Sequence, residues 1–360
     1  MKSFRMRYIR YCLLGLLLTS VFMFRFIGGW GEWYACHLYS ALSFVLSGAA
    51  SVVPFSVCEV VVILFVLFLI GYPFYARKRS RKSVKSILRA ELECVLWLYV
   101  WFYWAWGMNY FRSDFFQRAH VERAEYNEDV FRSFLSEYAD SLNASYCSAD
   151  SELNRRQIED SIKQSFRSVP SSFGLSCPRS FQHPKRSLVN PLYSKVGVLG
   201  YMGPFFCESH LNYQLFPLQY PFVYAHELSH LLGVSAEAEA NYWAFKMCVR
   251  SSSSFVRYSG YSGLLPYVLS NAYALLSPED CDKWVATLRP EVVADFSAQR
   301  KFWREEYSPL LGSIQDKLYT LYLKGNKIPT GQKNYAEVVG LLLATSSHEK
   351  KIVRFELSRF

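Results

Sequence analysis

Two histidines and a glutamate stand close together in the segment HELSH, residues 226–230. Histidines four residues apart lie on one face of an α-helix, so His226 and His230 can present ring nitrogens to a single metal ion. Glu227 directly follows the first histidine, in the position where a carboxylate acts as general base on zinc-bound water. The spacing therefore predicts a Zn²⁺ centre of the hydrolase type, and a chance match on an ordinary helix is the alternative.

The surrounding residues predict two helices joined by a tight reversal. The first helix follows Pro221 and runs through Leu232, with Gly233 as its stop. Ser235 is a suitable cap for a second helix that begins with the segment AEAEANYWAF. Such a reversal brings the first turn of the second helix back toward the histidine pair.

The first turn of the second helix carries two carboxylates, Glu237 and Glu239. Two residues apart on a helix means about 200° of rotation, so only one of them can face the metal. Glu237 shares a face with Asn241, whose amide would orient a ligand, and Glu237 is therefore predicted as the third ligand. Glu239 is the alternative, or else a first-turn carboxylate favoured by the helix dipole.

Further residues are candidates for contact with the substrate. Arg257 and Tyr258 follow the second helix and offer a cation and a phenol to stabilise the negative charge that develops in hydrolysis. Upstream, residues 196–203 (VGVLGYMG) predict an edge strand that pairs with an extended substrate, with Glu208 and Asn212 just beyond it. An ordinary structural role is the alternative for each of these four side chains.

The first third of the chain is far more apolar than the rest. Three stretches have the length and composition of membrane spans, at about residues 11–30, 56–76 and 90–110. Residues 35–55 are less apolar and predict an interfacial or re-entrant helix rather than a span. A cleaved signal peptide is the alternative for the first stretch, but Arg25 interrupts it and no clear cleavage site follows, which favours an uncleaved anchor.

The net charge of +10 arises largely from two basic clusters beside these stretches, at residues 2–10 and 77–89. Clusters in such positions set topology and attract anionic lipid, so nucleic acid is not expected as a partner. The positive-inside rule places both clusters in the cytoplasm and everything after Tyr110 outside. The lipid bilayer is accordingly a predicted partner.

The part after Tyr110 reads as a mostly helical domain. Helical periodicity is clear over residues 127–169, and short strands are expected at Val196–Met202 and His210–Phe216. The predicted fold class is a membrane α-helical part with three spans, residues 1–110, followed by a mostly helical α+β domain with a small sheet, residues 111–360.

Several stretches resemble a family of bacterial membrane proteins of unknown function that are classed as zinc-dependent peptidases. The segment HELSHLLGVSAEAEAN matches the family pattern HExxHxxGxxxExEAN. The other matching stretches are VVPFSVCEVV, WAWGMNYFR, LGYMGPFFCESHLN, FVRYSGY and YLKGNKIPTGQKNYAEVVGLLLA. The HExxHxxG portion is also similar to metzincins, but their third ligand would fall on Ala236, whereas peptidases with a Glu ligand on a following helix favour Glu237. The resemblance implies a zincin-like domain outside the bacterial inner (cytoplasmic) membrane.

The predicted function is that of a membrane-anchored zinc metallopeptidase, a hydrolase that cleaves a peptide or protein substrate with Glu227 as general base. One alternative is a non-catalytic zinc-binding scaffold or sensor, which has no need of the carboxylate of Glu227. The other is a zinc hydrolase that acts on a non-peptide amide, and the sequence does not separate this from a peptidase.

Overall fold

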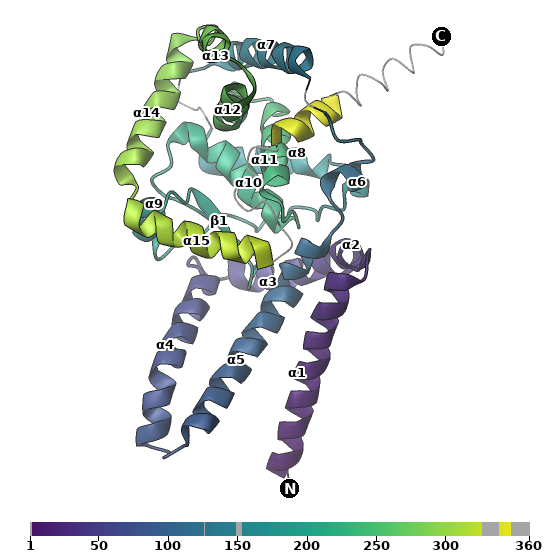
Figure 1. The fold of residues 1–360 in the computed structure, drawn as a ribbon, viewed down its shortest axis with the longest axis vertical. Coiled ribbons are helices and arrows are strands. Elements are labelled where there is room, and N and C mark those ends of the chain that lie inside the picture. The colour runs from purple at the N-terminus through teal and green to yellow at the C-terminus, as the bar shows by residue number, and fades with distance from the viewer. Residues whose placement is uncertain (1, 126, 149–152, 326–337, 347–360) are drawn as a thin grey trace.

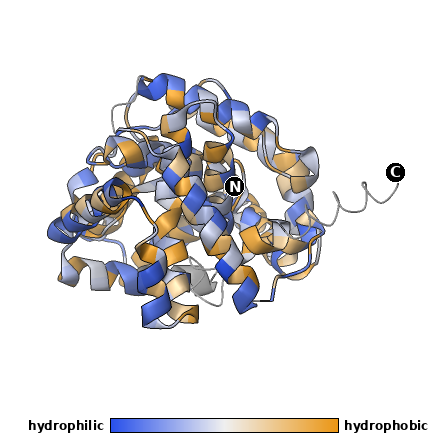
Figure 2. Cartoon of the chain, turned by 90° about the horizontal axis from the view of Figure 1, so that it is seen from above, coloured by the Kyte–Doolittle hydropathy of each residue, from blue (hydrophilic) through white to orange (hydrophobic). Residues whose placement is uncertain are grey.

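The computed structural model describes residues 2–125, 127–148, 153–325 and 338–346. The chain forms a rounded body from which three long helices project side by side (Figure 1). Seen from above, the helices of the body carry both hydrophilic and hydrophobic residues (Figure 2). The structure is mostly helical with one small sheet, as the sequence predicts.

The three long helices are α1 (Lys2–Phe26), α4 (Val57–Lys78) and α5 (Val84–Ala105). Two of them are long and apolar enough to cross a membrane, over Met6–Phe26 and Val57–Lys78. Helix α5, predicted as the third span, has charged residues throughout its first half, at Lys85, Arg89, Glu91 and Glu93. An ion pair between Arg10 and Glu93 joins α1 to α5 near their free ends.

The ends of these helices differ from the predicted spans for local reasons. The first helix begins far earlier than residue 11 and ends at Phe26, ahead of Gly29, whose φ of +83° does not continue a helix. The third ends at Ala105 because Trp106 has a φ of −155°, and a short 3-10 helix, η2 (Gly107–Phe111), follows. The apolar stretch up to Tyr110 therefore contains a bend.

A helical segment lies across the upper ends of the long helices (Figure 1). It consists of α2 (Trp30–Trp33), the π-helix η1 (Tyr34–Tyr39) and α3 (Ser40–Ser51). Helix α3 buries its small polar residues Ser43 and Ser47 and exposes apolar ones, with Phe44 48% and Val45 63% exposed. An outward apolar face is the pattern expected of the interfacial helix that the sequence predicts at 35–55.

The core of the body is made by α10 (Tyr220–Leu231), α11 (Glu237–Val249) and α12 (Ser254–Leu275). All of α10 is buried except His226, in keeping with a helix that is surrounded by other elements. Helices α7 (Glu128–Ser145) and α8 (Arg155–Arg167) pack against this core and confirm the helical periodicity of residues 127–169. The remaining elements are α6 (Phe115–Ala119), η3 (Ser171–Phe173), α9 (Asn190–Lys195), η4 (Pro217–Gln219), α13 (Pro278–Val285), α14 (Pro290–Glu306), α15 (Pro309–Gly325) and a helical segment at 338–346.

The sheet of the described residues is one antiparallel pair, β1 (Gly200–Gly203) and β2 (Glu208–Leu211). Tyr201 lies opposite His210 in its register. Both strands are displaced from the predicted Val196–Met202 and His210–Phe216. Residues 196–198 form a turn around Gly197, whose φ is +73°, and the second strand ends where Asn212 turns the chain toward η4.

The reversal between α10 and α11 forms as predicted, with one correction. Gly233 has a φ of +100°, a conformation that glycine adopts readily, and it ends the first helix. Ser235 was expected to cap the second helix, but the cap position is Ala236 and no side chain caps it. The hydroxyl of Ser235 instead donates to the backbone oxygen of Asn109, 3.1 Å away.

Candidate metal centre

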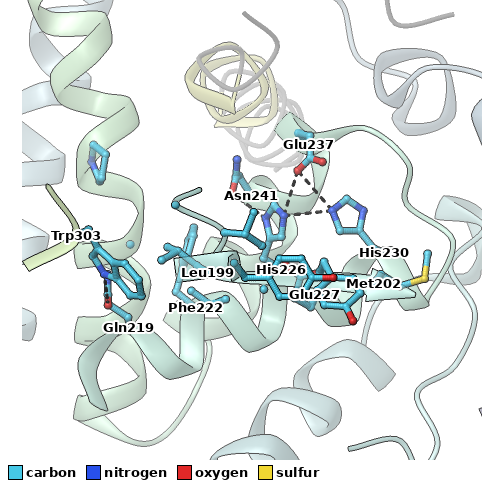
Figure 3. Close-up of a pocket in the computed structure, with 18 of the residues that line it drawn as sticks. Leu199, Met202, Gln219, Phe222, His226, Glu227, His230, Glu237, Asn241 and Trp303 are labelled. Atoms are coloured by element: carbon cyan, nitrogen blue, oxygen red, sulfur yellow. Dashed lines mark hydrogen bonds and ion pairs between the residues drawn. The ribbon is translucent and has the colours of Figure 1, made fainter. Parts of the chain in front are cut away.

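Three side chains converge where α10 and α11 meet (Figure 3). The Nε2 atoms of His226 and His230 are 3.2 Å apart, and a carboxylate oxygen of Glu237 lies 3.1 Å from the first and 3.5 Å from the second. Tetrahedral zinc with bonds of about 2.0–2.1 Å separates its ligand atoms by roughly 3.3 Å. The spacing and the chemistry of this donor set therefore fit one Zn²⁺ ion.

The other nitrogen of each ring faces an oxygen acceptor. Nδ1 of His226 lies 2.9 Å from the side-chain oxygen of Asn241, and Nδ1 of His230 lies 2.8 Å from the backbone oxygen of Val234. In its neutral form, a ring that donates from Nδ1 has its lone pair on Nε2, the atom aimed into the cluster. These partners hold both rings in the tautomer and orientation that metal binding requires.

The reversal between α10 and α11 is held by hydrogen bonds to the segment that follows α5. The indole nitrogen of Trp106 donates to the backbone oxygen of His230 at 2.9 Å, and Arg112 donates to that of Gly233 at 3.1 Å. The hydroxyl of Ser235 completes the set with its bond to Asn109. The stretch WAWGMNYFR, quoted above for its resemblance, thus fixes the reversal between the two helices.

Glu227 lies in the wall of the same cavity and is only 4% exposed. One of its carboxylate oxygens, Oε2, is buried with no hydrogen-bond partner among the described residues. Burial raises the pKa of this carboxyl to about 7. A buried polar atom without a partner is costly, and this one lies in the same cavity lining as the candidate cluster.

The charges of the cluster are strongly coupled. Burial disfavours the charged form of His230, but the carboxylate of Glu237 outweighs it and raises the pKa of His230 to about 9. Burial likewise opposes the charge of Glu237, and the two imidazoles outweigh it and hold the pKa of Glu237 well below its usual value. The carboxylate is thus held ionised, as a ligand of a divalent cation must be.

The cluster opens into a cavity of about 790 Å³. Residues 198–202 line it, together with residues of α14 and α15. The indole nitrogen of Trp303 donates to the side-chain oxygen of Gln219 in the lining, at a distance from the cluster (Figure 3). The lining includes Trp106, Tyr110, Leu199, Met202, Phe222, Tyr267, Phe296, Arg300, Gln315 and Asp316.

Several predicted residues lie outside the lining of this cavity. Glu239 is buried in an ion pair with Arg118 and accepts a hydrogen bond from Trp243, so it stabilises the packing of α11. The hydroxyl of Tyr258 donates to Asp295, and the catalytic role predicted for Tyr258 has no support from this position. Arg257 donates to the backbone oxygens at 251 and 252 and closes the loop before α12.

Glu208 and Asn212, predicted to contact substrate or a ligand, hold the hairpin in place instead. Glu208 accepts from the backbone amides of Val57 and Cys58 at the start of α4 and pairs with Lys185. The amide of Asn212 donates to the backbone oxygen of Val198, 3.0 Å away. Both residues thus act at the ends of the hairpin, away from the cluster.

The cavity also contains a phenol that sequence reasoning missed. Tyr267 lines it and interacts with Asn241 and Glu237. Burial raises the pKa of Tyr267 to about 12, so its proton is retained at neutral pH. No motif surrounds this residue. Tyr267 lies on α12 nine residues after Tyr258, hence on the opposite side of the helix, and only the packing of α12 brings it to the cavity.

The fold and the candidate site define a mostly helical protein with two helices able to cross a membrane and one candidate metal centre among its described residues. A family model described as a protein of unknown function, DUF3810, matches residues 34–343, and the chain belongs to this family. No curated protein and no solved structure matches the chain. The zincin-like fold and the three spans therefore stay predictions.

Proposed function

We propose that this protein is a membrane-anchored zinc metallopeptidase that hydrolyses peptide bonds outside the cytoplasmic membrane. One observation carries the proposal: Glu227 has a buried, unpartnered carboxylate oxygen in the same cavity wall as the converging side chains of His226, His230 and Glu237. A structural zinc site has no use for a second carboxylate that is not itself a ligand, since such sites are closed by their ligands.

His226, His230 and Glu237 are the proposed ligands. Bound Zn²⁺ would supply a Lewis acid that polarises the substrate carbonyl and makes water more acidic. Glu227 accepts a proton from the attacking water and passes it to the leaving amine. The amide C–N bond breaks, the oxygen of water joins the acyl carbon, and the amine leaves with the proton.

The remaining parts of the cavity suit a peptide. Residues 198–202 line the cavity and include most of β1, and an extended chain can add to an open strand edge through main-chain hydrogen bonds. Tyr267 retains its proton and is proposed as a hydrogen-bond donor to the negatively charged oxygen that develops in the reaction. A mostly apolar lining excludes water and strengthens such bonds.

The membrane part of the proposal rests on helix length and charge. Helices α1 and α4 are long and apolar enough to span, and α5, packed between them, is proposed as the third span. The basic residues at 2–10 and 77–89 lie at the ends of the long helices away from the body (Figure 1). The positive-inside rule then places the candidate metal centre on the outer side.

The decisive variant is Glu227→Gln, which keeps the size of the side chain and removes its ability to accept a proton. Full-length protein is purified in detergent, its zinc is measured, and cleavage of a randomised peptide library is read by mass spectrometry. We expect one zinc per chain in both proteins and a loss of cleavage of roughly 10²-fold to 10⁴-fold in the variant.

The matched control is Glu306→Gln, an acidic residue on α14 that pairs with Lys195 outside the cavity. It should cleave like the wild type. Equal cleavage by the Glu227→Gln and wild-type proteins, both loaded with zinc, would show that the cluster is a metal site without this chemistry.

A further inference from the structure

The outer edge of β1 is the open edge of the sheet. Strand β2 is covered on its far side, because the backbone amide of Lys185 donates to the oxygen of Ser209 at 2.8 Å. Strand β1 pairs with β2 alone among the described residues, and Gly200 and Met202 on it line the cavity. An extended chain in the cavity therefore has one strand edge with which to pair.

This edge leads from the metal ligands toward the long helices. At one end, a methyl group added to Gly200 would lie 2.8 Å from Glu227, so the strand backbone passes directly beside the proposed base. At the other end, the hairpin tip docks on the end of α5. The indole nitrogen of Trp101 donates to the backbone oxygen of Phe205 at 3.0 Å, and the rings of Phe102 and Phe205 are 6.2 Å apart.

The end of α5 has the composition of a membrane interface. Its last turns carry a run of aromatic residues in the segment WLYVWFYWA, and Trp101 is 43% exposed. Trp106, which follows directly, contacts His230 with ring centroids 6.5 Å apart. The side chain of Trp106 thus links the proposed ligand His230 to the end of α5, which we place at the membrane interface.

Two other elements near the end of α5 also expose apolar side chains. Helix α15 lies just above the long helices (Figure 1) and exposes Leu310 by 71% and Ile314 by 51%. Two residues of the same helix, Gln315 and Asp316, line the cavity. The exposed apolar face of α3, with Val45 63% exposed, lies at this level too. The cavity therefore reaches the part of the body that faces the bilayer.

We infer that the substrate is the segment of a membrane-anchored polypeptide that lies next to its anchor. The inference rests on the proposed function and assigns its substrate class. Three residue steps separate Gly200 from Gly203, roughly 10 Å of extended chain, and the hairpin tip follows. A peptide on the β1 edge that is cut beside Glu227 enters the membrane interface only a few residues from the cleaved bond.

Tethering gives such a substrate a large advantage. Once the anchor of the substrate lies beside this protein in the bilayer, a short flexible link holds the attached peptide at an effective concentration in the millimolar range, which decreases roughly as the −3/2 power of link length. A free peptide at about 10 µM should therefore be cleaved about 100-fold more slowly than the same peptide on a short link. Extending the link from about 6 to about 24 residues should slow cleavage about 8-fold.

The test uses the full-length protein in vesicles of phosphatidylethanolamine and phosphatidylglycerol. A randomised dodecapeptide library is supplied free, and also fused at either end to a transmembrane helix through links of about 3, 6, 12 and 24 residues. Cleavage of each form is read by mass spectrometry. We expect the short-link forms to be cleaved fastest and the free form slowest.

The variant Ile314→Asn adds a test of the membrane-facing surface, with Ser313→Asn on the same helix as its control. Ile314→Asn should slow cleavage of the tethered forms and leave that of free peptide unchanged. Equal cleavage of free and tethered forms at every link length overturns the inference and leaves the peptidase proposal standing. Zinc-loaded protein that cleaves neither form defeats both proposals.

Discussion

The close approach of β1 to Glu227 makes Gly200→Ala a sharp test of the site. A methyl group at residue 200 would lie 2.8 Å from both Cγ and Oε1 of Glu227, and 3.0 Å from the backbone oxygen of His210 on the neighbouring strand. Carbon atoms in contact are ordinarily about 3.5–4.0 Å apart. The strand cannot retreat toward β2, so the Glu227 side chain must move by about 1 Å.

A displacement of about 1 Å at a catalytic group costs on the order of 100-fold in rate. Each tenfold corresponds to about 1.36 kcal/mol, so the expected loss of transition-state stabilisation is about 2.7 kcal/mol. The ligand cluster does not touch the added methyl group, and zinc content should stay at one per chain. The assay is kcat/KM for the best-cleaved library peptide, measured beside the zinc content and the unfolding temperature.

Two comparisons separate a local effect from a general one. Gly48→Ala on α3 places its methyl group 3.7 Å from Phe181, an ordinary contact, and should retain full activity. The double variant Gly200→Ala/Glu227→Gln should be no slower than Glu227→Gln alone, because both changes act through one carboxylate. A folded, zinc-loaded Gly200→Ala protein with wild-type kcat/KM would refute the placement of Glu227 as the base beside β1.

Two further predictions concern metal binding and pH. Glu237→Ala should abolish tight zinc binding, whereas Glu239→Ala should keep the metal. The second variant should lower the free energy of unfolding by about 3 kcal/mol, because it leaves the guanidinium of Arg118 buried without the carboxylate of Glu239. Metal analysis and thermal unfolding test both expectations, and the reverse pattern would exchange the two roles. Burial lowers the pKa of His210 to about 4, so between pH 6.5 and 4 the unfolded chain binds a proton that the folded chain does not, and stability falls on acidification by up to about 3 kcal/mol. Unfolding at pH 7 and pH 5 checks this, and a His210→Phe protein with an unchanged loss would contradict it.

The sequence by itself determined the local parts of the candidate site. His226, His230 and Glu237 lie within twelve residues, and helix periodicity with a glycine stop suffices to bring them to one place. The two apolar helices and the mostly helical body also follow from composition and periodicity, which are properties of contiguous segments. Such features need no knowledge of how distant segments pack.

The tertiary structure decided everything that depends on segments far apart in the chain. Tyr258 and Tyr267 both lie on α12, and only the packing of that helix turns Tyr267 toward the cavity and Tyr258 toward Asp295. The side chain of Glu208 is bound to the start of α4, 150 residues away in sequence. A single sequence has no local signal for contacts of this kind, because they arise from the way separate elements bury their apolar faces against one another.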